Sequence, residues 1–184
     1  RAFIGVIFGS TLVIAGGCVI NNYIDRTIDK KMVRTKKRAT ATGAISGKNT
    51  LAFGALLTIA GFAILLVQTN ILTTLVGFVG FVFYVVFYSI YKRKSPAGTL
   101  VGSVSGATPP VAGYVAATNT LDVTALLLFF ILVFWQMAHF YAIAIYRKSE
   151  YQKAGLPLLS IERGVKLTQN RTIGSMVAFF IAVI

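Results

Sequence analysis

Two carboxylates and one amide recur at intervals of four residues in NNYIDRTID, where an apolar stretch meets a strongly basic one. Because steps of four return to nearly the same face of an α-helix, Asn21, Asp25 and Asp29 are predicted to form one polar stripe about 12 Å long. Carboxylate and amide oxygens are hard ligands of the kind that Mg²⁺ prefers, with water and phosphate oxygens completing its shell. The spacing therefore predicts a magnesium site that handles a phosphate-bearing substrate.

A purely structural role is the alternative for this stripe, in which the carboxylates only pair with neighbouring cations such as Arg26, Lys30 or Arg34. The expected depth of Asn21 and Asp25 in the membrane favours the functional interpretation. Asn21 and Asp25 still belong to the apolar segment, where polar groups are costly and usually functional.

The basic stretch that follows the carboxylates supplies groups for an anionic substrate. Arginine binds phosphate through two parallel hydrogen bonds, so the segment RTKKR could hold a diphosphate and stabilise it as a leaving group. We predict a catalytic set formed by Asn21, Asp25, Asp29, Arg34 and Arg38. The predicted diphosphate-binding cations are Arg34, Lys37, Arg38, Lys92, Arg93, Arg147 and Lys148.

Hydropathy indicates that these residues belong to a membrane protein. The mean hydropathy is +0.76, and only 12% of the residues are charged. Six apolar segments are long enough to cross a bilayer or to begin a crossing, at about 2–23, 50–67, 71–91, 99–118, 122–145 and from 172 onward. We predict an all-α polytopic transmembrane bundle that forms one domain over residues 1–184, truncated at both ends, with five complete spans and the start of a sixth.

The net charge of +13 is confined to alternate loops. Basic residues gather in 26–48, 92–94 and 147–171, whereas the connections 68–70 and 118–122 contain no Lys or Arg. This alternation follows the positive-inside rule and argues against nucleic-acid binding. We expect the basic loops to face the cytoplasm if the protein lies in a bacterial plasma membrane, or the matrix if it lies in the mitochondrial inner membrane.

Aromatic residues follow helical spacing in the segment between the first and second basic loops. Phe81, Tyr84, Tyr88 and Tyr91 share a predicted face, and ring faces can shield a developing carbocation while excluding water. Contact with lipid, in an interfacial aromatic belt, is the alternative.

Small residues and prolines characterise the next segment. Gly98, Gly102 and Gly106 recur every fourth residue, which predicts close helix packing in a membrane. Pro109 and Pro110 lack an amide donor and are expected to break or kink the helix beside a cavity.

The only histidine, His139, lies eight residues before Arg147, about 12 Å below the basic edge of its helix. With Gln136 one turn earlier, it is predicted to face a functional cavity, where it could ligate haem iron, orient a substrate or move a proton. Glu150 is either a second metal-binding carboxylate or a partner for Lys148. The only cysteine, Cys18, has no partner for an intrachain disulfide. It follows two glycines inside an apolar run and is predicted to be a packing residue.

The chain resembles the UbiA-type intramembrane prenyltransferases, and most closely their protoheme IX farnesyltransferase branch, also called haem O synthases. The family motif NxxxDxxxD matches Asn21, Asp25 and Asp29, and RTKKR matches its basic continuation. The blocks YKRKSPAGTLVGSVSGATPPVAGY, WQMAHFYAIAIYRKSEY and AGLPLL indicate the haem branch. The resemblance extends from the first span to about residue 157. The chain departs from the pattern at Ala39 and Ala138, where the family has Pro, and at Glu150, where Asp is frequent.

This resemblance implies transfer of a farnesyl group from farnesyl diphosphate to a vinyl group of haem B, with Mg²⁺ as cofactor and haem O as product. It implies metal binding by Asn21, Asp25, Asp29 and Glu150, haem-side contacts from His139 and Gln136, and a prenyl pocket with Phe81, Tyr84 and Tyr88. The implied partners are farnesyl diphosphate, haem B and the lipid bilayer, with association with haem A synthase or a terminal oxidase assembly as a further expectation.

Two alternatives remain at the level of the sequence. Another branch of the same family, acting on hydroxybenzoate or a chlorophyll precursor, would keep the metal site and change the acceptor pocket. A transporter would use the polar stripe as an ion site, but it should carry polar residues through the full depth of the bilayer.

Overall fold

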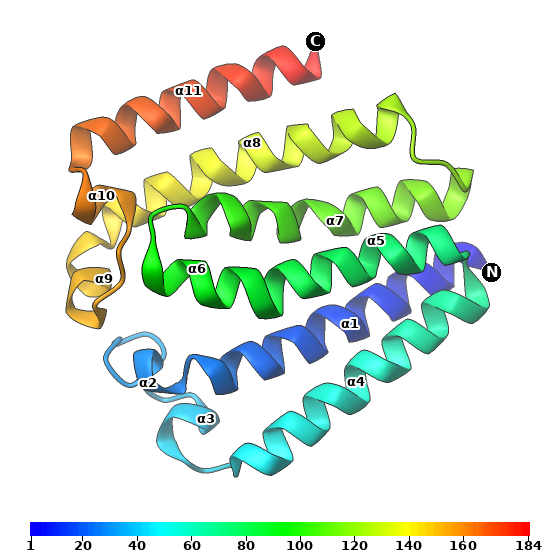
Figure 1. Cartoon of the computed structure of the whole chain (residues 1–184), viewed down its shortest axis with the longest axis horizontal. Coiled ribbons are helices and arrows are strands. Elements are labelled where there is room, and N and C mark those ends of the chain that lie inside the picture. The colour runs from blue at the N-terminus through cyan, green and yellow to red at the C-terminus, as the bar shows by residue number, and fades with distance from the viewer.

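The computed structural model describes residues 1–184 as helices without strands, in agreement with the predicted all-α bundle (Figure 1). Long helical segments run side by side, and short helices occupy the loops between them. The long segments are α1 (Ala2–Ile24), α4 (Gly47–Gln68), α5 (Ile71–Val82) continued by η1 (Phe83–Tyr88) and α6 (Ser89–Lys94), α7 (Gly98–Thr118), α8 (Val123–Tyr146) and α11 (Val165–Val183). The short helices are α2 (Arg26–Asp29), α3 (Ala39–Thr42), α9 (Lys148–Ala154) and α10 (Leu159–Glu162).

Four segments are long and apolar enough to cross a membrane, namely Ala2–Ile24, Gly47–Gln68, Ile71–Lys94 and Val123–Tyr146. Helix α7 has the expected length but is less apolar, because small and hydroxyl-bearing residues replace large aliphatic ones. Helix α11 begins at Val165, well before the expected position 172. Only 35 of 184 residues are buried, and many large apolar side chains are exposed, which is the distribution expected for helices in contact with lipid.

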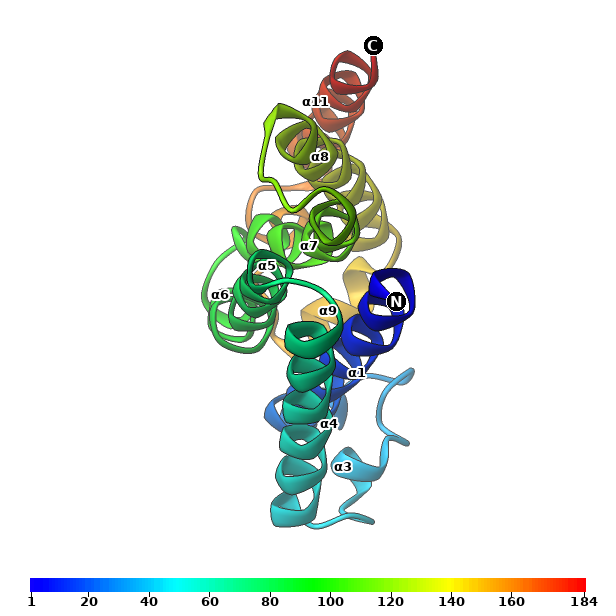
Figure 2. The same cartoon turned by 90° about the vertical axis from the view of Figure 1, so that its right-hand side faces the viewer.

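The basic loops and the loops without Lys or Arg lie at opposite ends of the bundle. In Figure 1, α2 and α3, the end of α6, and α9 and α10 all lie at one end of the long helices. The α4–α5 and α7–α8 connections, which carry no Lys or Arg, lie at the opposite end. Seen along the helices, in Figure 2, α4 and α11 lie at opposite edges of the bundle with α7 between them. The structure thus gathers the three basic loops at one end, which we call the basic end.

Helices α1 and α4 approach each other closely because glycines face each other across their interface. A Cβ on Gly61 would lie 2.7 Å from both the Gly9 carbonyl oxygen and the Val13 amide nitrogen. A Cβ on Gly16 would lie 2.2 Å from Thr58 Oγ1. Backbone therefore packs on backbone, as in membrane helix pairs built on small residues. This contact fixes the position of α1, which carries the polar stripe.

Three of the four glycines of α7 lie against residues of neighbouring segments, which confirms the predicted close packing. A Cβ on Gly98 would meet the Lys92 backbone at 2.6 Å, and one on Gly102 would meet the Tyr88 ring at 3.0 Å. A Cβ on Gly106 would meet Gln136 Oε1 at 2.0 Å. Helix α7 is therefore the element against which both the aromatic segment and α8 are positioned.

The prolines do not break the helix, because α7 continues through Pro109 and Pro110 to Thr118. Pro109 lines a cavity, as predicted, and a kink at this position stays a prediction. A proline at position 109 leaves the carbonyl of Ser105 without its helical donor. The Thr108 hydroxyl donates to that carbonyl at 2.8 Å and replaces the missing bond. A neighbouring hydroxyl thus offsets part of the cost of proline in a membrane helix.

Local hydrogen bonds stabilise the end opposite the basic end, where the loops carry Asp122 but no Lys or Arg. Asn70 caps α5 through the Thr73 amide and donates to the Val115 carbonyl of α7 at 3.1 Å. Asp122 caps α8 through the Ala125 amide and accepts from Tyr114 at 2.7 Å. The Tyr114 hydrogen bond, with the cap, holds the pKa of Asp122 below its ordinary value. At the start of α4, near the basic end, Ser46 accepts from the Asn49 amide and caps the helix.

The α1–α4 contact makes a testable prediction about stability. Gly61→Ala should destabilise the protein by about 1–3 kcal/mol, because the new methyl meets backbone atoms that cannot move without shifting α1. Gly113→Ala in α7 is the matched control, since nothing lies within 4 Å of a Cβ there. Thermal unfolding in detergent measures both variants, and an equal midpoint in the two would contradict the proposed close approach.

Candidate active site

A cavity of about 520 Å³ opens between α1, the α5–η1–α6 segment, α7 and α8. Its charged lining residues, together with Asn21, lie at the basic end and come from α1, α2, the 25–38 segment and α6. They are Asp25, Asp29, Arg34, Arg38 and Lys92. Its apolar lining includes Val13, Ile14, Leu65 and Phe81. The cavity therefore joins a charged mouth to an apolar interior, and it contains most of the residues that the sequence singles out.

Asn21, Asp25 and Asp29 stay on one face although helix α1 ends between Asn21 and Asp29. Helix α1 ends at Ile24, and Asp25 is its C-terminal residue with φ −85° and ψ −1°. The Asp25 amide nevertheless donates to the Asn21 carbonyl at 2.8 Å, and the Asp29 amide donates to the Asp25 carbonyl at 2.8 Å. Because both bonds have helical i to i−4 connectivity, the three side chains keep the same face.

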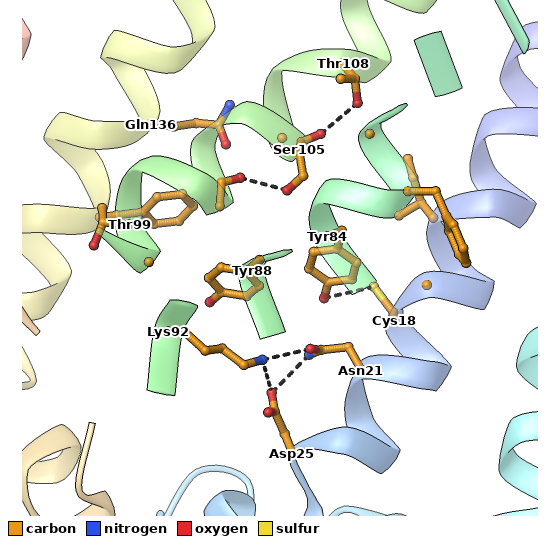
Figure 3. A pocket seen from close by; sticks show the side chains of 18 of the residues that line it. Cys18, Asn21, Asp25, Tyr84, Tyr88, Lys92, Thr99, Ser105, Thr108 and Gln136 are labelled. Atoms are coloured by element: carbon orange, nitrogen blue, oxygen red, sulfur yellow. Dashed lines mark hydrogen bonds and ion pairs between the residues drawn. The ribbon is translucent and has the colours of Figure 1, made fainter. Parts of the chain in front are cut away.

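Lys92 links the stripe to the aromatic segment, as Figure 3 shows. Its Nζ donates to Asn21 Oδ1 at 2.8 Å and to Asp25 Oδ2 at 2.5 Å, and it lies 4.6 Å from the centre of the Tyr88 ring. The Asn21 amide nitrogen donates to Asp25 Oδ2 at 3.1 Å, and the Ser89 hydroxyl donates to Asn21 Oδ1 at 3.3 Å. The buried Asn21 amide and the largely buried Asp25 carboxylate are thus held by a cation from a helix far away in sequence.

Asp25 has a second cation, Arg93, which is more exposed than Lys92, and Asp29 has a cation of its own, Arg38. Arg93 donates to Asp25 Oδ1 at 3.1 Å and to the Ile24 carbonyl at 2.6 Å. Arg38 donates to Asp29 Oδ2 at 2.9 Å. The ion pairs with Arg26, Lys30 or Arg34 that formed the structural alternative are absent. The stripe is therefore neutralised by groups that could also contact a bound anion.

A π-helical segment presents the aromatic residues to the cavity. Because π-type bonds span five residues rather than four, η1 changes the register of the face between α5 and α6. Phe81, Tyr84 and Tyr88 line the cavity together with Lys92, and the two tyrosine rings stack at 5.9 Å with an interplanar angle of 9°. Tyr91 is exposed and lies outside the cavity, so the four rings predicted to share a face do not.

The side of the cavity formed by α7 and α8 is polar but carries no charged side chain. Thr99, Ser105 and Thr108 of α7 and Gln136 of α8 contribute uncharged polar groups there. Cys18 also lines the cavity, with its Sγ 3.8 Å from the Tyr84 hydroxyl. The α7 hydroxyls and the nearby Thr35 and Tyr151 were missed in the sequence, although Thr99, Gly102 and Gly106 recur at helical spacing and indicated this face.

Several predicted site residues lie outside the cavity lining. Lys37, Arg147 and Lys148 do not contribute to it, and Arg93 reaches the site only through Asp25. Glu150 accepts from Arg147 at 3.3 Å and from the Arg34 amide at 3.3 Å, rather than pairing with Lys148. The metal and diphosphate roles of these residues remain predictions.

His139 and Gln136 occupy different faces of α8. Gln136 is 7% exposed and lines the cavity, whereas His139 is exposed and stacks on Trp135 at 5.6 Å with an interplanar angle of 3°. Within this chain the two side chains therefore do not converge. A haem-side role for His139 remains a prediction, and it would require contact outside the cavity.

The donor chemistry at the charged mouth suits a hard divalent cation. No group of three or more His, Cys, Asp or Glu side chains converges in the chain. Asp25 and Asp29 face the same cavity, and the structure gives Asp29 Oδ1 no protein hydrogen bond. A metal held there would take its other ligands from Asn21, water and a substrate phosphate, which is the coordination Mg²⁺ commonly adopts.

These features define a class, an integral membrane protein whose helices enclose a charged-to-apolar cavity. The model of the UbiA prenyltransferase family matches residues 1–184, and the chain belongs to that family. The apo structure of a UbiA homolog from Aeropyrum pernix K1 has the same fold, with a TM-score of 0.71 and 20% sequence identity. The match covers 98% of this chain and 74% of that one.

Relatives of higher identity carry a more specific name. A protoheme IX farnesyltransferase from Edwardsiella ictaluri is 50% identical over 181 residues, and one from Pectobacterium atrosepticum is 51% identical over 181 residues. Each match covers 98% of this chain and 61% of the relative. The chain therefore spans 61% of the length of these two proteins.

The Lys92 network predicts a loss of stability that a second change restores. Lys92→Met should destabilise the protein by on the order of 3 kcal/mol, because it leaves the buried Asp25 charge short of its closest cation. Combining it with Asp25→Asn should recover much of the loss. Denaturant unfolding in detergent measures this cycle, with the exposed Lys94→Met as the control. Additive losses in the double variant would argue against the pairing.

Proposed function

We propose that the protein to which this chain belongs transfers a farnesyl group from farnesyl diphosphate to a vinyl group of protoheme IX, producing haem O. The observation that carries this proposal is the cavity, whose charged mouth suits a diphosphate and whose apolar interior suits an isoprenoid chain. About 50% identity to proteins named protoheme IX farnesyltransferase supports the choice of donor and acceptor.

The residues at the mouth would bind and activate the diphosphate. Arg38 and Lys92, which neutralise the stripe in this structure, would contact the diphosphate oxygens as negative charge grows on the leaving group. Asn21, Asp25 and Asp29 would hold Mg²⁺, which when bound supplies positive charge to the diphosphate. Arg34 also lines the mouth and belongs to the same proposed set. Lys37, Arg93, Arg147, Lys148 and Glu150 would act only from the periphery.

The interior would guide the allylic cation to the acceptor. Phe81, Tyr84 and Tyr88 offer ring faces beside the point where the diphosphate leaves, and ring faces attract cations while excluding water. The terminal vinyl carbon of the acceptor would then form the new carbon–carbon bond. Water adds to the resulting cation and supplies the hydroxyl group of the product. No nucleophilic side chain is required for this sequence.

The setting we propose is a bacterial plasma membrane, or the mitochondrial inner membrane, with the basic end facing the cytoplasm or matrix. Association with haem A synthase or a terminal oxidase assembly would pass on the product. A transporter is less well supported, because the charged cavity residues lie at one end of the bundle.

The metal role predicts the effect of removing one charge. Asp25→Asn or Asp29→Asn in the full-length protein should lower Mg²⁺-dependent haem O formation roughly 100-fold or more, since each removes an anionic oxygen while keeping the side-chain shape. Asp122→Asn is the control, because its carboxylate lies in the α7–α8 connection, at the end opposite the proposed metal site. Tetrapyrrole analysis of membranes measures the product. Normal Mg²⁺-dependent turnover in the first two variants would remove them from the metal site.

The diphosphate role predicts a separate effect on donor binding. Arg38→Ala should weaken farnesyl diphosphate binding roughly tenfold or more, because a charge-assisted hydrogen bond to the substrate is lost. Lys36→Ala provides a control in the same loop, since Lys36 is exposed and does not line the cavity. Equilibrium binding of labelled farnesyl diphosphate is the measurement. Equal affinities in the two variants would count against the assignment of Arg38.

A further inference from the structure

Gln136 is a buried amide that the protein leaves without a partner. It lies in the middle of α8, is 7% exposed and lines the cavity, yet neither its nitrogen nor its oxygen forms a hydrogen bond with the protein. An unsatisfied amide at this depth costs free energy, so a ligand group or water is expected to bind it. Figure 3 shows its side chain projecting into the cavity.

The hydroxyl groups of Ser105 and Thr108, near Gln136, already donate their protons to backbone carbonyls but can still accept hydrogen bonds. The Ser105 hydroxyl donates to the Gly102 carbonyl at 2.8 Å, and the Thr108 hydroxyl donates to the Ser105 carbonyl at 2.8 Å. Each hydroxyl oxygen keeps acceptor capacity towards the cavity. The amide of Gln136, which can both donate and accept, therefore has acceptors beside it. This combination suits a small molecule such as water, which needs two to four polar partners.

The glycines of α7 give the depth of Gln136 relative to the charged mouth. Gly98 contacts Lys92, Gly102 contacts Tyr88 and Gly106 contacts Gln136, each four residues further along one helix. One such step is about 6 Å, so Gln136 lies about 12 Å from the level of Lys92. That separation leaves room for an allylic carbon, the two carbons of a vinyl group and one water between the diphosphate and the amide.

The two sides of the cavity also differ. Residues of α1, α4 and α5, such as Val13, Leu65 and Phe81, provide apolar surface for a prenyl chain. Gln136 lies on the opposite side, with the hydroxyls of α7. A water bound to Gln136 would therefore approach the acceptor rather than the leaving group, where it would hydrolyse the donor.

We propose that Gln136 holds the water molecule that becomes the product hydroxyl. This inference rests on the proposed function. The allylic carbon–oxygen bond breaks and the diphosphate keeps the electron pair. The terminal vinyl carbon forms the carbon–carbon bond, which leaves a cation on the carbon next to the porphyrin ring. The oxygen of the water bonds to that carbon, and its extra proton passes to solvent or diphosphate.

The test is a change in the identity of the product. Without the held water, the same cation loses a proton and yields an alkene that is lighter by one water molecule. In membranes of cells expressing full-length protein, supplied with protoheme IX and farnesyl diphosphate, Gln136→Leu should raise the alkene-to-alcohol ratio at least tenfold. Gln136→Glu, which keeps side-chain length and hydrogen bonding, should restore the alcohol. Mass spectrometry measures the ratio, and water labelled with oxygen-18 should label the alcohol.

The control is Gln152→Leu, because Gln152 is exposed on α9 and lies outside the cavity lining. A lower rate with an unchanged product ratio in Gln136→Leu would overturn the proposal, as would an alcohol without label from water. If Gln136→Leu does not accumulate, Gln136→Met is measured by the same two criteria. Failure of wild-type protein to prenylate protoheme IX would instead contradict the proposed function itself.

Discussion

The constraint on which the structure depends is the cost of burying an amide and two carboxylates where a membrane helix ends. The residues next to these carboxylates in sequence do not neutralise them. Lys92 neutralises Asp25 and Arg38 neutralises Asp29, so the charges of α1 and α2 are compensated by α6 and by the loop before α3. Three segments must therefore come together for the stripe to exist. The close α1–α4 contact and the packing of α6 on α7 hold them in place.

The same ion pairs place both cations and carboxylates at the mouth of the cavity. The cations that stabilise the carboxylates are the groups best placed to contact an incoming anion, and the carboxylates are the groups best placed to bind a metal that arrives with it. A metal and an anion can thus exchange partners with the internal pairs without introducing net charge into the cavity. This arrangement avoids leaving either sign of charge unpaired in a medium that solvates charge poorly.

The positions of the long helices and the composition of the charged mouth could be predicted from the sequence, because hydropathy and a four-residue spacing are local properties. What could not be predicted depends on contacts between distant segments or on small changes of helical register. The π-helical segment moves Tyr91 away from Tyr84 and Tyr88, although α-helical spacing groups them. The hydroxyl of Thr108 replaces the bond that Pro109 removes, and α7 continues through both prolines. His139 and Gln136 are three residues apart, yet only the second faces the cavity.

The glycine spacing of α7 has a consequence for how such a cavity can diverge. Gly98 lies against the Lys92 backbone at the level of the ion pairs, Gly102 against the Tyr88 ring, and Gly106 against the Gln136 amide. A single methyl group at one level would displace its own contact and leave the other two in position. The stacked rings and the amide can therefore shift independently, by changes that add no charge and remove no functional group. One small substitution on α7 would thus reshape one level of the cavity while the ion pairs at its mouth stay in place.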